Sequence, residues 1–170
     1  MKKSLFVLFL LIAATIQAQT LTNSAWTTML PGDEEIEMVL NFDDDGECYI
    51  ILTSETFEDL GDGMNMTMRA SLSVPGIFNQ DGRDITLSFN KKKAEFVFDH
   101  QLNGADSQTR ALFNSFVEPE LKKMEPELKS HLLEMVPSFI DNMKIVSVSK
   151  SKLVVSYNGG NLTFYPTGKG

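Results

Sequence analysis

The sequence contains very few of the residues that most often build catalytic or metal centres. Its 170 residues include one cysteine, Cys48, and two histidines, His100 and His131. A lone cysteine cannot form an internal disulfide, and two histidines so far apart show no metal-ligand spacing. There is also no nucleophile elbow and no phosphate-binding glycine-rich loop. We therefore expect no catalysis, no resident metal and no cofactor, and we expect Cys48 to be a small buried hydrophobic residue.

Positive charge is scarce as well. The chain has 15 lysines and arginines against 23 aspartates and glutamates, for a formal net charge of −8. Such acidity argues against nucleic acid and against anionic membrane surfaces as partners. It favours solubility and repulsion between copies of the chain.

The first eighteen residues have the pattern of a secretory signal peptide. Lys2 and Lys3 precede an apolar run over residues 5–14, and Ile16-Gln17-Ala18 resembles a signal peptidase site. The run is short for a bilayer span, and no cysteine follows it to carry a lipid. No second long apolar run appears in the sequence, so no membrane anchor is expected. We expect a signal peptide at 1–18 and one periplasmic or secreted domain at 19–170.

Most of the later sequence alternates apolar and polar residues, as half-buried strands do. The clearest case is 64–74, and Pro75-Gly76 is expected to end that strand. The acidic segment 55–63 is expected to be a loop, and Asp and Gly at 43–46 a hairpin turn. Strands are expected at residues 26–30, 36–42, 47–54, 64–74, 85–89, 94–98, 145–148, 153–157 and 162–164.

Residues 105–143 follow a helical period instead. Asp106 or Ser107 is a plausible N-cap, and Pro119, Pro126 and Pro137 predict two or three helices rather than one. Residues 118–122 recur at 125–129, which returns two leucines to one helix face. The apolar residues that follow this helical period are Leu112, Phe113, Phe116, Val117, Leu121, Met124, Leu128, Leu132, Met135, Val136, Phe139, Ile140 and Met143. The predicted fold is mainly β: an up-and-down barrel or sandwich of eight to nine short strands, with this helical insert before the last three.

Several segments resemble the secreted lipocalin-like proteins of Bacteroidetes-type bacteria. Leu21 to Trp26 resembles their opening, with Ser24-Ala25-Trp26 where Gly-x-Trp is usual. Leu40-Asn41-Phe42 before Asp45-Gly46 resembles their first hairpin, and 80–87 resembles a mid-barrel turn and strand. The closing segments 145–148, 152–155 and 162–164 are also similar. The resemblance implies a calycin-type barrel but no particular ligand, because that fold has many functions.

Two functions are compatible with this reading. The first is binding of a small apolar or amphipathic molecule inside the barrel, by desolvation in a largely preformed pocket. The second is a protein-interaction module that presents the insert to a partner; whether the insert is a lid, a core element or a docking surface stays open. The candidate ligand-binding residues are Met38, Leu40, Phe42, Met66, Met68, Phe89, Phe96 and Phe98.

Two metal hypotheses have weaker support. Met64, Met66 and Met68 alternate on one strand face and could offer thioether ligands to Cu(I), although ordinary packing explains them as well. The segment 43–47 is acidic but lacks calcium-loop spacing, so a solvated hairpin turn is favoured.

Overall fold

The computed structural model describes residues 21–30 and 36–167. The expected signal peptide lies outside them, as does Pro31-Gly32, which the sequence suggests as the end of the first strand. The described elements are, in chain order, β1 (Ser24–Met29), β2 (Ile36–Phe42), β3 (Glu47–Gly61), β4 (Met64–Asp81), β5 (Asp84–Phe89), the 3-10 helix η1 (Lys91–Lys93), β6 (Glu95–Asn103), α2 (Ser107–Phe116), α3 (Glu118–Met135), β7 (Phe139–Val148), β8 (Leu153–Tyr157) and β9 (Gly160–Pro166).

Eight of these strands form a closed antiparallel barrel. Each of β1 to β4 pairs with the next strand along the chain, β5 pairs with β7, and β7 to β9 continue in order. The barrel closes between β1 and β9, where Trp26 lies opposite Pro166 and Thr27 opposite Tyr165. The predicted up-and-down barrel with a helical insert before the last three strands is therefore confirmed.

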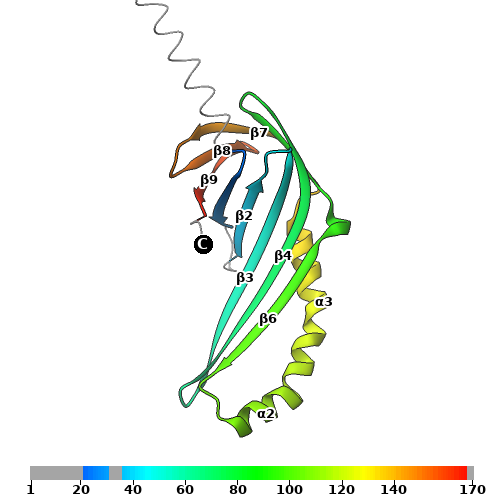
Figure 1. The fold of residues 1–170 in the computed structure, drawn as a ribbon, viewed down its shortest axis with the longest axis vertical. Helices are drawn as coiled ribbons and strands as arrows, with labels where there is room; N and C mark the ends of the chain where they lie inside the picture. The colour runs from blue at the N-terminus through cyan, green and yellow to red at the C-terminus, as the bar shows by residue number, and fades with distance from the viewer. Residues whose placement is uncertain (1–20, 31–35, 168–170) are drawn as a thin grey trace, which may run out of the picture.

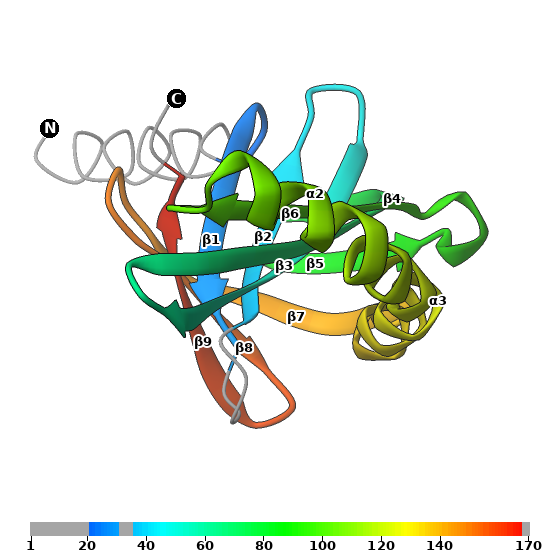
Figure 2. The ribbon, with the colours of Figure 1, turned by 90° about the horizontal axis from the view of Figure 1, so that it is seen from below.

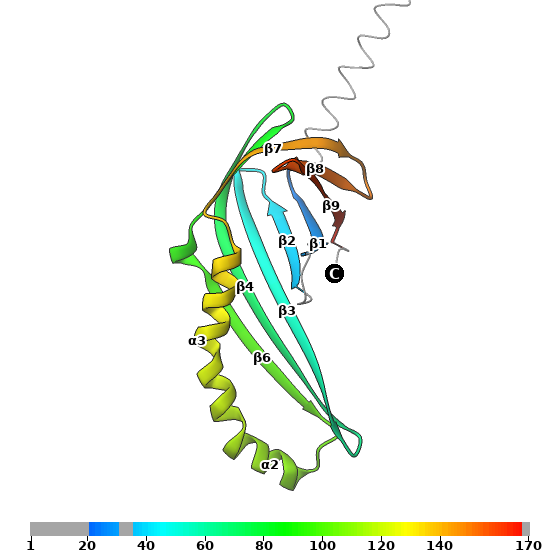
Figure 3. The ribbon, with the colours of Figure 1, turned by 180° about the vertical axis from the view of Figure 1, so that it is seen from behind.

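The ninth strand, β6, belongs to a three-stranded extension of the barrel wall. Residues 65–73 of β4 pair with β6, whereas residues 76–81 pair with β5. β3 pairs with β4 along almost its whole length, and its second half continues past the end of β2. Figures 1 and 3 show β3, β4 and β6 reaching well below the other strands. We call residues 55–61 of β3, residues 64–73 of β4 and β6 the extension.

The extension corrects two sequence expectations. Residues 55–63 were expected to be a loop, but 55–61 continue β3, and Pro75-Gly76 lies inside β4 rather than at its end. Glu and Asp are uncommon in strands, so local preference gave no sign of β3 continuing. The second half of β3 pairs with β4 alone, and the side chains of this half are exposed. Acidic residues on such an edge oppose pairing with another chain.

The barrel interior is packed with aliphatic and aromatic side chains. Leu72 and Val74 of β4, Leu87 of β5 and Phe164 of β9 are fully buried in one cluster. Trp26 belongs to the same cluster, and its indole N–H donates a hydrogen bond to Ser24 Oγ at 2.7 Å. Ser24 therefore satisfies the hydrogen-bond donor of the buried Trp26 ring.

The two helices begin and end where local chemistry predicts. Asp106 is the N-cap of α2, with its carboxylate accepting from Thr109 N–H at 2.7 Å. α3 has Pro119 in its first turn, continues through Pro126 and ends before Pro137. The helical part is shorter than residues 105–143, because β7 begins at Phe139; Ile140 and Met143 are strand residues. Figure 2 shows both helices on the side of the molecule away from β8 and β9.

Gly76 lies where β4 is flanked by β3 on one side and β5 on the other. A Cβ atom at this position would lie 2.5 Å from the Ser88 carbonyl oxygen and 2.8 Å from the Phe89 ring. The Ser88 contact is with backbone, which cannot move without disturbing the ladder. Only glycine fits this close approach of two strands.

We predict that Gly76→Ala lowers the free energy of unfolding by about 1–3 kcal/mol through overpacking. The measurement is urea unfolding followed by circular dichroism. Gly160→Ala is the matched control, because its Cβ would meet no atom closer than Tyr157 O at 3.8 Å. Equal stability of the two variants would contradict the proposed steric role of Gly76.

Candidate functional site

The structure divides the eight predicted ligand-binding residues between two clusters. Leu40, Phe42 and Phe89 are buried in the barrel core, and Met38 and Phe96 pack against it. Met66 and Met68 instead belong to a second cluster in the extension, and Phe98 contacts both clusters. The sequence pattern correctly placed Met66 and Leu72 on one face of β4. It could not show that this face leaves the barrel interior and continues under the helices.

The second cluster holds the helical insert on the extension. Met66 of β4, Leu102 of β6 and Leu121 of α3 are buried together, with Phe113 of α2 and Ala105 packed against them. We call this group the anchor cluster. It explains the methionine alternation by packing, because Met66 and Met68 contact apolar neighbours.

The C-terminal end of α3 joins the barrel core itself. Leu132 and Val136 are 2% and 0% exposed and belong to the barrel cluster. Lys91 of η1 donates a hydrogen bond from Nζ to the Leu133 carbonyl oxygen at 2.9 Å. The positive charge of Lys91 also interacts favourably with the negative, C-terminal end of the α3 dipole. α3 is therefore attached at both ends, by the anchor cluster and by the barrel core.

Other apolar side chains of the insert remain in solvent. Phe116 at the end of α2 is 71% exposed, Leu112 one turn earlier is 54% exposed, and Met124 of α3 is 47% exposed. Val117 and Met135 are also exposed. We call these five residues the apolar stripe. Only some apolar residues of the insert are therefore buried in the fold. The exposed ones, the apolar stripe, are the leading candidate for a binding site.

A second feature of this region is an open hollow beside His100. It has a volume of about 470 Å³ and is lined by residues of β6 and α2, among them Asn103, Arg110 and Phe113. The His100 ring lies 5.7 Å from that of Phe113. The pKa of Glu118 is lowered, chiefly by its hydrogen bond from Lys122 and to a smaller extent by the charge of His100. The ring contact places α2 beside β6.

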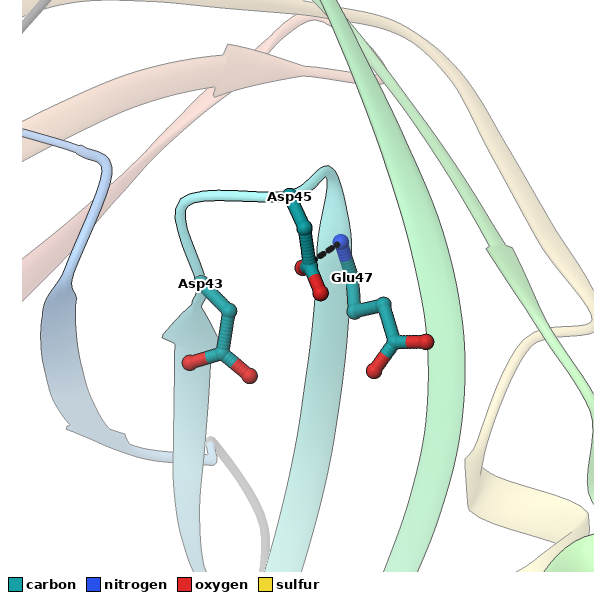
Figure 4. A group of neighbouring side chains, drawn as sticks. All are labelled: Asp43, Asp45 and Glu47. Carbon is teal, nitrogen blue, oxygen red and sulfur yellow. Dashed lines mark hydrogen bonds between the residues drawn. The ribbon is translucent and has the colours of Figure 1, made fainter.

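The acidic β2–β3 turn is the one described group whose carboxylates approach one another closely enough to share a cation. Ligand oxygens of Asp43, Asp45 and Glu47 all lie within 4.8 Å of one another. Figure 4 shows Asp45 also accepting the backbone N–H of Glu47, a bond of 3.1 Å. That bond, together with the backbone bond from Asp43 N–H to the Glu47 carbonyl, shows the predicted hairpin turn. Turn formation accounts for Asp45 without a metal.

Cys48 follows this turn, buried inside the barrel as the sequence predicts. Burial and, to a smaller extent, the charge of Asp43 raise the pKa of its thiol from 9.0 to about 12. The neighbouring Tyr49 is half-buried, and its pKa is raised chiefly by the charge of Glu47. A thiol with a raised pKa is a poor nucleophile at neutral pH.

Among the residues that the structure describes, no helix has the length and apolarity needed to cross a membrane. No family model matches the sequence, and searches of curated proteins and of solved structures likewise return no match.

We predict that Leu121→Ala lowers the free energy of unfolding by about 2–4 kcal/mol, because it opens a cavity in the anchor cluster. Leu112→Ala removes the same atoms from an exposed position of α2 and should change stability by less than about 0.5 kcal/mol. Urea unfolding of both variants provides the comparison. Equal losses would mean that α3 is not anchored through Leu121.

We also predict that Cys48 is protected from thiol reagents in the folded protein. At pH 8, labelling should be slower than in concentrated urea by on the order of a hundredfold or more, since it requires opening of the barrel. Cys48→Ala combined with Ser151→Cys supplies an exposed thiol as control. The folded thiol keeps its proton while the unfolded thiol loses it, so this contribution to stability is complete below pH 9.0 and declines towards pH 12. Fast native labelling at pH 8 would contradict the burial of Cys48.

Proposed function

We propose that this protein is a secreted, non-catalytic binding protein with a lipocalin-like barrel, and that it binds a partner protein through its helical insert. The observation that carries the proposal is the apolar stripe. Its five exposed apolar side chains lie in two consecutive helices and at the residue between them, and exposed apolar patches typically mark interaction sites. Phe116 is the strongest case, because a phenylalanine that is 71% exposed contributes little to its own fold.

The construction of the insert supports the same conclusion. α3 is attached at both ends, through Leu121 in the anchor cluster and through Leu132 and Val136 in the barrel core. Met124 and Met135 of the apolar stripe are therefore presented from a supported helix, and Phe113 packs α2 against the anchor cluster. A preorganised surface loses less conformational entropy on binding than a disordered one.

The other function, binding of a small apolar molecule inside the barrel, is less well supported by the packing. Three of its candidate residues, Leu40, Phe42 and Phe89, are at most 6% exposed and pack against other core side chains. The hollow beside His100 and a second hollow along Tyr49, Ile77 and the η1 lysines both lie outside the barrel core. An internal ligand would have to displace part of this core.

Secretion is proposed from the signal-peptide pattern of residues 1–18 alone. The lipocalin-like assignment is proposed from the resemblance of the strand segments and is supported by the up-and-down barrel. The absence of a catalytic role is proposed from the lack of a nucleophile, base and orienting group in one recognisable sequence motif.

We predict that a photo-crosslinking amino acid at position 116, in the cells that produce the protein, captures a single major protein. The same amino acid at Val97 is the control, because Val97 is also exposed but belongs to β6 in the extension. Mass spectrometry of the adducts identifies what is attached. The position-116 adduct should disappear when Met124→Asp is added, since a charge placed in the apolar stripe has to be desolvated on binding.

Equal capture at positions 116 and 97 would contradict a specific surface on the insert. Native mass spectrometry of protein purified from the same cells tests the other function. A retained small molecule that persists in the Met124→Asp variant would show that the barrel, and not the insert, is the binding site.

A further inference from the structure

One side of α3, which is partly exposed and partly buried, has the residue spacing of a helix-pairing surface. Six residues recur at alternating intervals of four and three: Val117, Leu121, Met124, Leu128, His131 and Met135. This is the spacing of the two core positions in a coiled-coil heptad. The row is about 27 Å long at 1.5 Å per residue, enough for a partner helix of five turns. We call it the α3 seam.

The two flanks of the α3 seam have different environments. On one flank, Glu118 and Glu125 are half-buried and Leu132 is buried, so this flank packs towards the extension and the barrel. On the other flank, Glu120, Glu127 and Glu134 are all exposed. Met124 and Met135 in the seam are exposed between them, whereas Leu121 is taken up by the anchor cluster. A helix packed on the α3 seam would therefore meet the three glutamates on its exposed flank.

That flank is acidic at every heptad. Glu120, Glu127 and Glu134 are spaced seven residues apart and occupy a position that flanks the core of the heptad. In coiled coils, the charge at such flanking positions selects the partner. Lys123 forms an ion pair with Glu120 at 2.6 Å and offsets one of the three charges. The whole chain has a net charge of −8, which adds to the negative field. The complementary helix should carry lysine or arginine on its flanking positions.

The same charges argue against a second copy as the occupant. In a parallel pair of α3 helices, each flanking residue faces the residue five positions further along the other copy, so Glu120 would face Glu125. In an antiparallel pair, Glu120, Glu127 and Glu134 would face the same three residues of the other copy. Either arrangement places like charges side by side, which destabilises pairing.

Building on the proposed function, we infer that the α3 seam binds an amphipathic helix of a partner protein whose flanking positions are basic. Apolar side chains of that helix pack against Met124, Leu128 and Met135, and its basic side chains pair with Glu127 and Glu134. This is recognition of a helix by a helical surface, in which the apolar contacts supply affinity and the flanking charges select the partner.

Two synthetic peptides of three heptads test this chemistry on the full chain. Both have isoleucine and leucine at the core positions; one has lysine at every flanking position and the other has glutamate. Like charges keep each peptide from pairing with itself. Measured by fluorescence anisotropy at low salt, the lysine peptide should bind at least about tenfold more tightly than the glutamate peptide, and the difference should shrink as salt rises.

Variants of the chain separate apolar from charged contributions. Glu127→Lys with Glu134→Lys should reverse the preference between the peptides. Asp81→Lys with Glu95→Lys changes the net charge equally at exposed positions of β4 and β6, and should leave the preference unchanged. Met124→Asp with Met135→Asp should abolish binding of the lysine peptide even though it adds negative charge. Met29→Asp, at an exposed position of β1, should not.

Several outcomes would overturn the inference. They are binding of neither peptide, equal binding of both, an unchanged preference after reversal of Glu127 and Glu134, or dimers of the chain that Met124→Asp dissociates. If neither peptide binds but position 116 still captures a protein, the proposed function stands and the partner's chemistry is wrong. If the lysine peptide binds but position 116 captures nothing, the surface chemistry is right and the proposed function fails.

Discussion

The long antiparallel pairing of β3 with β4 is the contact on which the other features of the structure depend. It runs from Glu47 opposite Ile77 to Gly61 opposite Met64, past the end of β2. The first part of this pairing belongs to the barrel wall. In the second part, the other edge of β4 pairs with β6. Without that second part, the helical insert would have no sheet to pack against. One hairpin therefore serves both the barrel core and the anchor cluster.

As a result, side chains on one face of β4 belong to both the barrel core and the anchor cluster. Leu72 and Val74 point into the barrel, and Met66, on the same face, points into the anchor cluster. Phe98, opposite Ala70, contacts both clusters and joins them. Interiors pack densely and change little in volume, so the insert is fixed relative to the barrel. The exposed side of α3 is consequently a defined surface, which is what binding a folded partner requires.

The insert uses its apolar residues in two different ways. Its seven-residue repeat keeps leucines at 121 and 128 in line, and the burial of Leu132 and Val136 continues the contact to the barrel. The remaining apolar residues, including Phe116 and Met124, are exposed although they would stabilise a larger core. Exposed apolar surface promotes aggregation, so the glutamates beside it also help to keep the protein soluble.

Local chemistry in the sequence was sufficient to predict the strand alternation, an N-cap at Asp106 or Ser107, more than one helix in the insert and the burial of Cys48. Each depends on a residue and its near neighbours. It did not identify residues 55–61 as a strand, because their acidic side chains are accommodated by pairing with β4 and not by strand preference. It assigned Ile140 and Met143 to the helix because their spacing suits either structure. Only the tertiary structure decided which apolar residues of the insert fold inward and which remain exposed. That choice depends on where the extension places its free face, and no single stretch of sequence contains that information.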